Sequence, residues 1–232
     1  VINRERAGEF LGKTVQIIPH ITDEIKNRIK RALKENDAEI VIVEIGGTVG
    51  DIESLPYIEA VRQMKWELGN ENCISLHLTL VPYLSASGEQ KTKPTQHSVK
   101  ALLEAGVQPD ILVLRSERSL SPELKRKVAL FCNVKEDSVV ESVDVKTIYE
   151  VPLLMLNQNL DTIVLRKLGL PEGEKPDLTD WRDFIDRINN PVHSVRVGLI
   201  GKYVELHDSY KSISESFIHA GAANKCRVIV EH

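Results

Sequence analysis

An apolar run at residues 40–45, with the sequence I-V-I-V-E-I, passes directly into the glycine-rich segment G-G-T-V-G. A short continuous apolar run is typical of a strand that is buried in a parallel sheet. Such sheets bind ligands at the carboxyl ends of their strands, so we expect the carboxylate of Glu44 to lie at a ligand site. Gly46, Gly47 and Gly50 would then let the backbone approach a bulky anion closely.

Strand-like and helix-like segments alternate along the chain, which favours an α/β fold with a parallel sheet flanked by helices. Strands are predicted at residues 40–45, 74–80 and 111–115. Helices are predicted at residues 55–68 and 95–105 and from Pro122 onward, with Ser54 and Ser121 as caps. The signals weaken after Asp144, except for an amphipathic helix at 178–188 and one βαβ unit formed by 195–200, 209–220 and 227–230.

A second informative stretch, G-E-Q-K-T-K-P-T-Q-H-S, begins at Gly88 and precedes a predicted helix. Lysines supply charge for a phosphate, while hydroxyl, amide and helix amino-terminal N–H groups supply directional donors. Together with the segment after residue 45, this stretch suggests a site for a metal-bound nucleotide.

The composition excludes several other classes of protein. Hydrophobic residues make up 42% and charged residues 28% of the chain, as in an ordinary soluble globular protein. No apolar run approaches a membrane span, and the start V-I-N-R-E-R is not a signal peptide. The net charge of −4 argues against a general nucleic-acid binder. Cys73, Cys132 and Cys226 form neither a zinc pattern nor a disulfide framework, so we expect a reducing, cytoplasmic setting.

Each candidate residue also has a purely structural interpretation. Glu44 could cap a neighbouring N–H group, and Asp51 and Glu53 could complement the dipole of the following helix. The lysines of residues 91–98 could be solvated, and residues 143–145 could be an ordinary strand end.

The sequences V-E-I-G-G-T-V-G-D-I-E-S-L-P (residues 43–56) and K-T-K-P-T-Q-H-S (residues 91–98) closely resemble the signatures of the CTP synthase family. The resemblance continues over essentially the whole chain, at residues 19–22, 80–83, 108–111, 129–134 and 201–206. It implies an amidoligase domain related to phosphate-loop NTPases at residues 1–185, with its N-terminal part missing. A linker at 186–194 and the first βαβ unit of a class I glutamine amidotransferase domain at 195–232 would follow.

The resemblance also implies roles for individual residues. Glu44 matches a magnesium ligand, and Asp51, Ile52 and Glu53 match a segment that contacts CTP as a feedback inhibitor. A carboxylate accepts a hydrogen bond from the amino group of cytosine, but in uracil it meets another acceptor. Glu53 would therefore distinguish the product CTP from the substrate UTP. Residues implied to bind UTP or CTP are Lys91, Thr92, Lys93, Pro94, Thr95, Gln96 and Lys127. Residues implied to contact the ATP base are Val143, Asp144 and Val145.

The activity implied by the resemblance is ATP-dependent amination of UTP to CTP, through a 4-phosphorylated UTP. Glutamine or ammonia supplies the nitrogen, Mg²⁺ and ATP are the cofactors, and the assembly is a homotetramer with no nucleic-acid or membrane partner. Two alternatives are a non-catalytic pyrimidine-nucleotide sensor and another phosphate-loop amidoligase or ATPase. The loop at residues 91–98 argues against the second alternative.

Residues 7–14, A-G-E-F-L-G-K-T, fit a permissive phosphate-loop pattern. We reject this match because a charged segment rather than a buried strand precedes it, and because Phe10 and Leu11 are bulky. The family's own phosphate loop, its second magnesium carboxylate and its amidotransferase triad have no counterpart in the chain. We therefore assign no certain catalytic residue within the chain, and we expect no CTP synthesis by the chain alone.

Overall fold

The computed structural model describes residues 1–173 and 175–231, which form two compact units. The first unit comprises Val1–Lys146 and Val151–Glu172. The second comprises Thr147–Glu150 and Gly173–His232. The domain boundaries predicted at residues 185 and 195 are those of the family's domains. The two compact units are defined by contacts instead, so the predicted boundaries stay predictions.

The first unit contains a three-stranded parallel sheet in the order β1-β4-β5. Its strands are β1 (Leu76–Leu80), β4 (Ile111–Ser116) and β5 (Val139–Val143). Leu76 pairs with Ile111, and Leu112 pairs with Val139. The predicted parallel α/β architecture is confirmed, together with the strand at residues 111–115.

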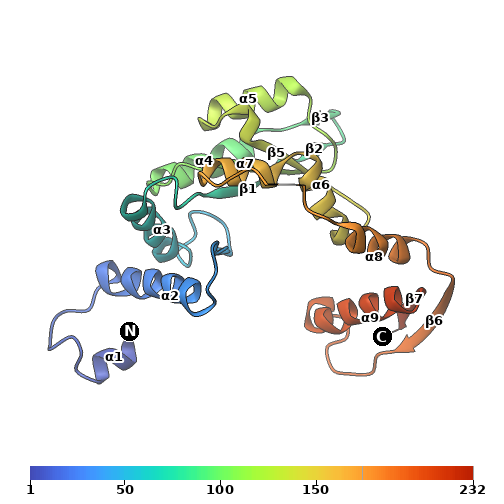
Figure 1. Cartoon of the computed structure of the whole chain (residues 1–232), viewed down its shortest axis with the longest axis horizontal. Helices are drawn as coiled ribbons and strands as arrows, with labels where there is room; N and C mark the ends of the chain where they lie inside the picture. Colours follow the sequence, from blue (N-terminus) through green and yellow to red (C-terminus); the bar gives the residue numbers. More distant parts are fainter. Residues whose placement is uncertain (174, 232) are drawn as a thin grey trace. The chain divides into compact units, whose positions relative to one another are not determined.

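Helices cover both faces of this sheet (Figure 1). Successive side chains of a strand point to opposite faces. Leu112 and Leu114 pack against α4 (Lys93–Glu104) and α5 (Pro122–Cys132) in one buried cluster. Ile111 packs in another with α7 (Leu160–Lys167), and α6 (Val151–Asn157) adds to the same face. This burial of both faces stabilises the sheet whose carboxyl edge carries the candidate site.

The remaining helices of the first unit are α1 (Ile2–Arg6), η1 (Ile17–Ile21), α2 (Thr22–Glu35), α3 (Leu55–Leu68) and η2 (Glu136–Ser138). The helix predicted at 55–68 is therefore confirmed at both ends. It packs through Ile58 against Leu102 and Val107, and Lys26 of α2 forms an ion pair with Glu67 of α3 at 2.6 Å.

The strand predicted at residues 40–45 is wrong, because this segment has no regular secondary structure. Ile42 is 93% exposed, so the apolar run is not buried. A strand needs a hydrogen-bonded neighbour, and in the described part of the chain this segment pairs with none. Hydrophobic pattern alone does not reveal whether such a neighbour exists.

The strand predicted at residues 74–80 is confirmed as β1, but its polar side chains are the buried ones and its leucines are exposed. Its buried side chains are those of His77 and Thr79, while Leu76, Leu78 and Leu80 are exposed. The polar pair faces α4: the His77 imidazole lies 2.9 Å from the Ser98 hydroxyl. These contacts fix α4 against the edge strand.

The second unit contains the predicted βαβ unit (Figure 1). Strands β6 (His193–Gly198) and β7 (Cys226–Glu231) pair in parallel, and α9 (Lys211–Ala223) connects them after the short turn η4 (His207–Tyr210). A Cβ atom at Gly221 would lie 2.6 Å from the carbonyl oxygen of Cys226, so glycine permits the close approach of α9 to β7. The helix predicted at 178–188 is α8 (Thr179–Asn189), and η3 (Ile148–Glu150) completes the unit.

Candidate functional site

The carboxyl ends of the three parallel strands lie along one edge of the sheet, at Leu80, Ser116 and Val143. The chain leaving β1 forms a small antiparallel hairpin, β2 (Tyr83–Leu84) and β3 (Glu89–Gln90), and then enters α4. Residues 144 and 145 follow β5 directly. The edge therefore joins two of the predicted nucleotide segments, which agrees with the general position of ligand sites in open α/β sheets.

Residues 91–96, here called the lysine loop, are held at this edge by contacts of the hairpin. The backbone N–H of Lys91 donates to the carbonyl of Pro82 at 2.9 Å. The Gln90 side chain donates to the carbonyl of Arg118 at 2.7 Å. The guanidinium carbon of Arg118 lies 3.9 Å from the centre of the Tyr83 ring, a cation–π distance. Sequence reasoning missed this support because strands of two residues leave no detectable pattern.

The two threonines of the lysine loop use their hydroxyls inside the protein. Thr95 is fully buried and donates to the carbonyl of Leu80 at 3.1 Å. Its hydroxyl therefore accepts from Thr79, whose oxygen is 3.0 Å away. Thr92 accepts from the side chain of Gln96 at 3.2 Å. The predicted nucleotide contacts of Thr92 and Thr95 stay predictions, and these hydroxyls already have protein partners.

The charged members of the lysine loop remain accessible. Lys93 and Pro94 are exposed at the first turn of α4, and the Lys91 side chain is 44% exposed. The Lys91 ammonium lies 2.5 Å from the Glu89 carboxylate and lowers the pKa of that carboxyl. Exposed ion pairs of this kind contribute little stability, so an incoming phosphate can replace Glu89 at small cost. The amino-terminal end of α4, although Pro94 has no N–H group to donate, also favours an anion.

Helix α5 carries two neighbouring lysines with different surroundings. Lys127 is exposed, as a nucleotide-contacting lysine would be. Lys125 is only partly exposed, and its ammonium lies 2.5 Å from the carboxylate of buried Glu141. The physical reason is that Glu141 on β5 is buried beneath α5 and needs a cation.

Glu44 lies in the irregular segment before α3 and is exposed. The backbone turns after it at Gly47, with φ of 84°, and at Gly50, with φ of 105°. In the described part of the chain, no group of three or more His, Cys, Asp or Glu side chains could hold a metal. A single accessible carboxylate is nevertheless chemically suited to Mg²⁺, which keeps several waters and takes its other oxygens from phosphates.

Asp51, Ile52 and Glu53 are exposed immediately before α3. The predicted position of Ser54 at the start of this helix is confirmed, but its side chain forms no cap hydrogen bond. Ser54 stands at the N-cap position, but its hydroxyl donates to the carbonyl of Asp51 at 3.0 Å instead of accepting from the helix. The serine thus closes the turn that presents residues 51–53.

Val143 ends β5, and Asp144 is exposed beyond it. The backbone N–H of Asp144 donates to the carbonyl of Ser116 at 2.9 Å, and Arg115 lies 3.6 Å from its carboxylate. Val145 is also exposed. This geometry fits both an ordinary strand end and a segment beside a nucleotide base.

Residues 7–14, the rejected match to the phosphate-loop pattern, follow helix α1 and not a strand. Leu11 is 87% exposed, with φ of 50°. Residues 11–14 do not open a helix. The segment therefore lacks the strand–loop–helix context of a phosphate loop, in agreement with its rejection.

Comparison with known proteins identifies the family. The sequence profile described as "CTP synthase N-terminus" matches residues 1–170. The chain belongs to the CTP synthase family. The protein named CTP synthase in Christiangramia forsetii is 62% identical over 232 residues, covering 100% of this chain and 42% of the relative. The CTP synthase of Flavobacterium johnsoniae is 62% identical over 230 residues (99% and 43%), and that of Bacteroides fragilis is 58% identical over 232 residues (100% and 43%).

The chain thus spans less than half the length of these CTP synthases. Within the part it spans, the sheet edge gathers the lysine loop and residues 143–145. Glu44 and residues 51–53 share a second segment, the stretch before α3. No helix in the described residues has the length and apolar character needed to cross a membrane.

Proposed function

We propose that this chain supplies the pyrimidine-nucleotide site and part of the ATP site of an enzyme that aminates UTP to CTP. The observation that carries the proposal is the position of the lysine loop. The lysine loop of this member of the CTP synthase family presents two accessible lysines. They lie beside the first turn of α4, at the carboxyl edge of a parallel sheet. A nucleoside triphosphate is the class of ligand that needs this density of positive charge.

Different residues of the chain bind different groups of the nucleotides. Lys91 and Lys93 neutralise the triphosphate of UTP, and Lys127 adds a further positive charge. Glu53 accepts from the amino group of CTP and so recognises the product as a feedback inhibitor. Asp51 and Ile52 complete that contact, and residues 143–145 lie against the base of ATP.

The reaction needs activation because oxygen is a poor leaving group from the uracil ring. The terminal phosphoryl group of ATP is transferred to O4, with ADP as the leaving group. Ammonia then adds at C4, and the O4 oxygen departs with the phosphate. Positioned positive charge lowers the barrier to phosphoryl transfer. Glu44 would hold Mg²⁺, which when bound neutralises phosphate charge.

Ammonia comes from glutamine, hydrolysed in the amidotransferase domain whose first βαβ unit is residues 195–232. The proposed assembly is a homotetramer that uses no nucleic acid and no membrane. A cytoplasmic setting is supported by Cys73, Cys132 and Cys226, all three of which are free thiols.

A chimera tests this function. In it, the chain replaces the matching 42% of the Christiangramia forsetii CTP synthase, to which it is 62% identical. We expect CTP formation from UTP, ATP and Mg²⁺ with either glutamine or ammonia, and no CTP formation by the 232-residue chain alone. A folded chimera that binds UTP but forms no CTP would favour the nucleotide-sensor alternative and contradict the proposal.

A further inference from the structure

The loop that follows β4 carries an arginine, Arg118, that has no part in the nucleotide contacts proposed above. Its side chain is exposed, and among the described residues no carboxylate pairs with its guanidinium. It lies instead over the ring of Tyr83, with 3.9 Å between the guanidinium carbon and the ring centre. Arginine stacks in this way because its guanidinium is planar and only weakly hydrated. The contact joins the loop after β4 to the hairpin that precedes the lysine loop.

Arg118 contacts both strands of the hairpin at the same level. Tyr83 on β2 and Gln90 on β3 are partners in the antiparallel pairing. Tyr83 meets the guanidinium of Arg118, and the Gln90 side chain donates to the Arg118 carbonyl at 2.7 Å. The next residue of the chain is Lys91, whose N–H donates to the carbonyl of Pro82 at 2.9 Å. Arg118 therefore holds the pair of residues from which the lysine loop starts.

The hairpin needs this support because its own strands hold it weakly. Each strand has two residues, and an isolated two-stranded hairpin is marginally stable at best in water. Residues 84–89, which form its turn, are exposed. A cavity of about 390 Å³, lined by Gly88 on the hairpin and by Leu124 on α5, lies between the two (Figure 1). Packing against the core therefore does little to position the hairpin.

The loop that carries Arg118 is, by contrast, held at both ends. Ser116 ends β4, and its carbonyl accepts from the N–H of Asp144 at 2.9 Å. Leu120 is buried in the core, and its N–H donates to the buried carboxylate of Glu141 at 3.2 Å. The backbone around Arg118 thus spans a short gap between two fixed points, which makes it a rigid support for the hairpin.

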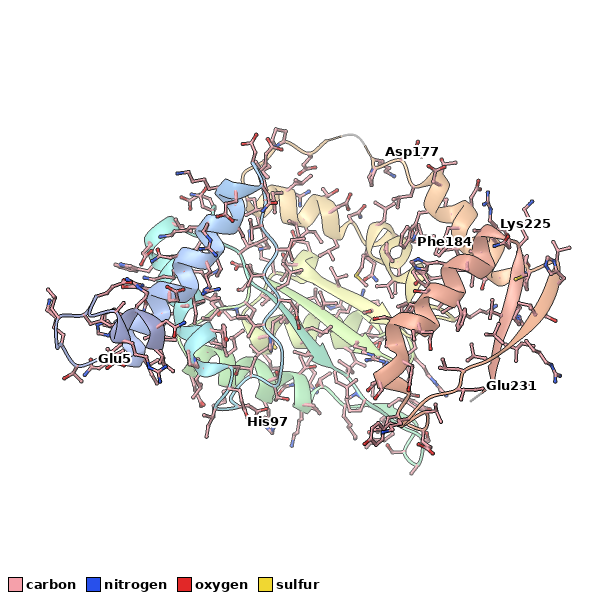
Figure 2. All side chains as sticks on the ribbon, turned by 90° about the horizontal axis from the view of Figure 1, so that it is seen from below. Glu5, His97, Asp177, Phe184, Lys225 and Glu231 are labelled. Carbon is pink, nitrogen blue, oxygen red and sulfur yellow. The ribbon has the colours of Figure 1, made fainter. Side chains whose placement is uncertain are left out.

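We propose that Arg118 is a positioning residue for the nucleotide site: by holding Tyr83 and Gln90, it sets where Lys91 meets the triphosphate of UTP. The inference rests on the proposed function. His97, labelled in Figure 2, follows the lysine loop directly and is exposed on α4, so a helix fixes the far end of the loop. The near end depends on the hairpin and hence on Arg118. A side chain that is already in place loses less freedom when it binds, which increases the affinity.

Calorimetric titration of UTP into the chimera tests this role. Arg118→Ala and Tyr83→Leu each remove one partner of the stack, and each should weaken UTP binding roughly threefold to tenfold. Tyr83→Phe keeps the ring and should bind UTP as the wild type does. Arg31→Ala, which removes an equal charge from the exposed surface of α2, is the control and should also leave the affinity unchanged.

The two possible failures of this titration are distinguishable. Unchanged affinity in both Arg118→Ala and Tyr83→Leu, in a chimera that binds UTP, overturns the inference and leaves the proposed function standing. A wild-type chimera that does not bind UTP contradicts the proposed function itself.

A double-mutant cycle separates positioning from direct contact with the nucleotide. If Arg118 acts through Lys91, its removal adds little once Lys91 is gone. The double variant Lys91→Ala/Arg118→Ala should then bind UTP within about twofold of Lys91→Ala. Additive losses, or a weakened Arg118→Ala beside a Tyr83→Leu variant with wild-type affinity, would show that the arginine itself touches the nucleotide and would contradict the inference.

Amide hydrogen exchange in the 232-residue chain tests the support without any nucleotide. The N–H of Lys91 is protected by its hydrogen bond to Pro82 and is exposed when the hairpin opens locally. Arg118→Ala and Tyr83→Leu should therefore speed its exchange roughly threefold to tenfold. Exchange at Leu112, in the buried central strand, should not change. Equal exchange rates of the Lys91 amide in the wild type and both variants would overturn the assigned support.

Discussion

Glu44 illustrates at the scale of one residue how exposure separates a structural role from a functional one. Its side chain is exposed in an irregular segment, so removing its charge should not alter the fold. In the chimera, Glu44→Gln should keep the melting temperature and the affinity for UTP. Loss of a metal ligand costs several kcal/mol of transition-state stabilisation, so we expect turnover to fall roughly a hundredfold. Near-normal turnover at saturating Mg²⁺ would mean that Glu44 does not bind the metal.

His77 gives a pH dependence with a defined sign. Burial lowers the pKa of His77 from its ordinary value of 6.5, so the folded chain holds the imidazole neutral to lower pH than the unfolded chain does. Between the two pKa values the unfolded state binds more protons, and the free energy of unfolding therefore falls as the pH falls. Below the folded-state pKa this loss is complete.

His77→Gln removes the titrating group and keeps a polar partner for Ser98. Urea unfolding between pH 7 and pH 5 should show a shallower loss of stability in this variant, by at most about 1.4 kcal/mol per pH unit. Identical slopes for the variant and the wild type would show that His77 does not contribute.

At the scale of secondary-structure elements, the buried Glu141 joins β5 to α5. Lys125→Ala would leave this carboxylate with its hydrogen bond from the backbone N–H of Leu120 but without a cation. Loss of a hydrogen bond to a charged group costs roughly 1.5–3 kcal/mol, which urea unfolding of the chain can measure. Arg126→Ala on the exposed face of α5 is the control and should change stability by less than about 0.5 kcal/mol. Equal effects of the two variants would contradict the pairing.

Elements with local start and stop signals were predictable from the sequence. Pro56 and Gly69 bound α3, and Ser121 accepts from the N–H of Leu124 as a cap should. The element at 40–45 was not predictable, because a strand depends on a neighbour that the run itself does not specify. Helices α6 and α7 were missed because the chain after residue 144 lacks strong caps and breakers.

At the scale of the whole molecule, family motifs located the candidate site better than physical patterns did. The lysine loop and the segment before α3 were recognisable from their sequence motifs. The structure adds which of their side chains are accessible. The buried hydroxyl of Thr95 could not be foreseen, since its partner Thr79 lies 16 positions away on β1. Nor could the packing of Tyr149 in the second unit, which depends on contacts with α9 about 70 residues later.

Calorimetric titration of UTP into the chimera tests most directly whether the lysine loop binds the pyrimidine nucleotide. The wild type should be compared with Lys91→Ala and with Lys100→Ala, a lysine that is 74% exposed further along α4. The Lys91→Ala variant loses one charge-assisted contact, so its affinity for UTP should be roughly tenfold to a hundredfold lower than that of the wild type. The Lys100→Ala variant should bind UTP as the wild type does. Wild-type affinity in Lys91→Ala, with the fold intact, would contradict the assignment of this loop as the nucleotide site.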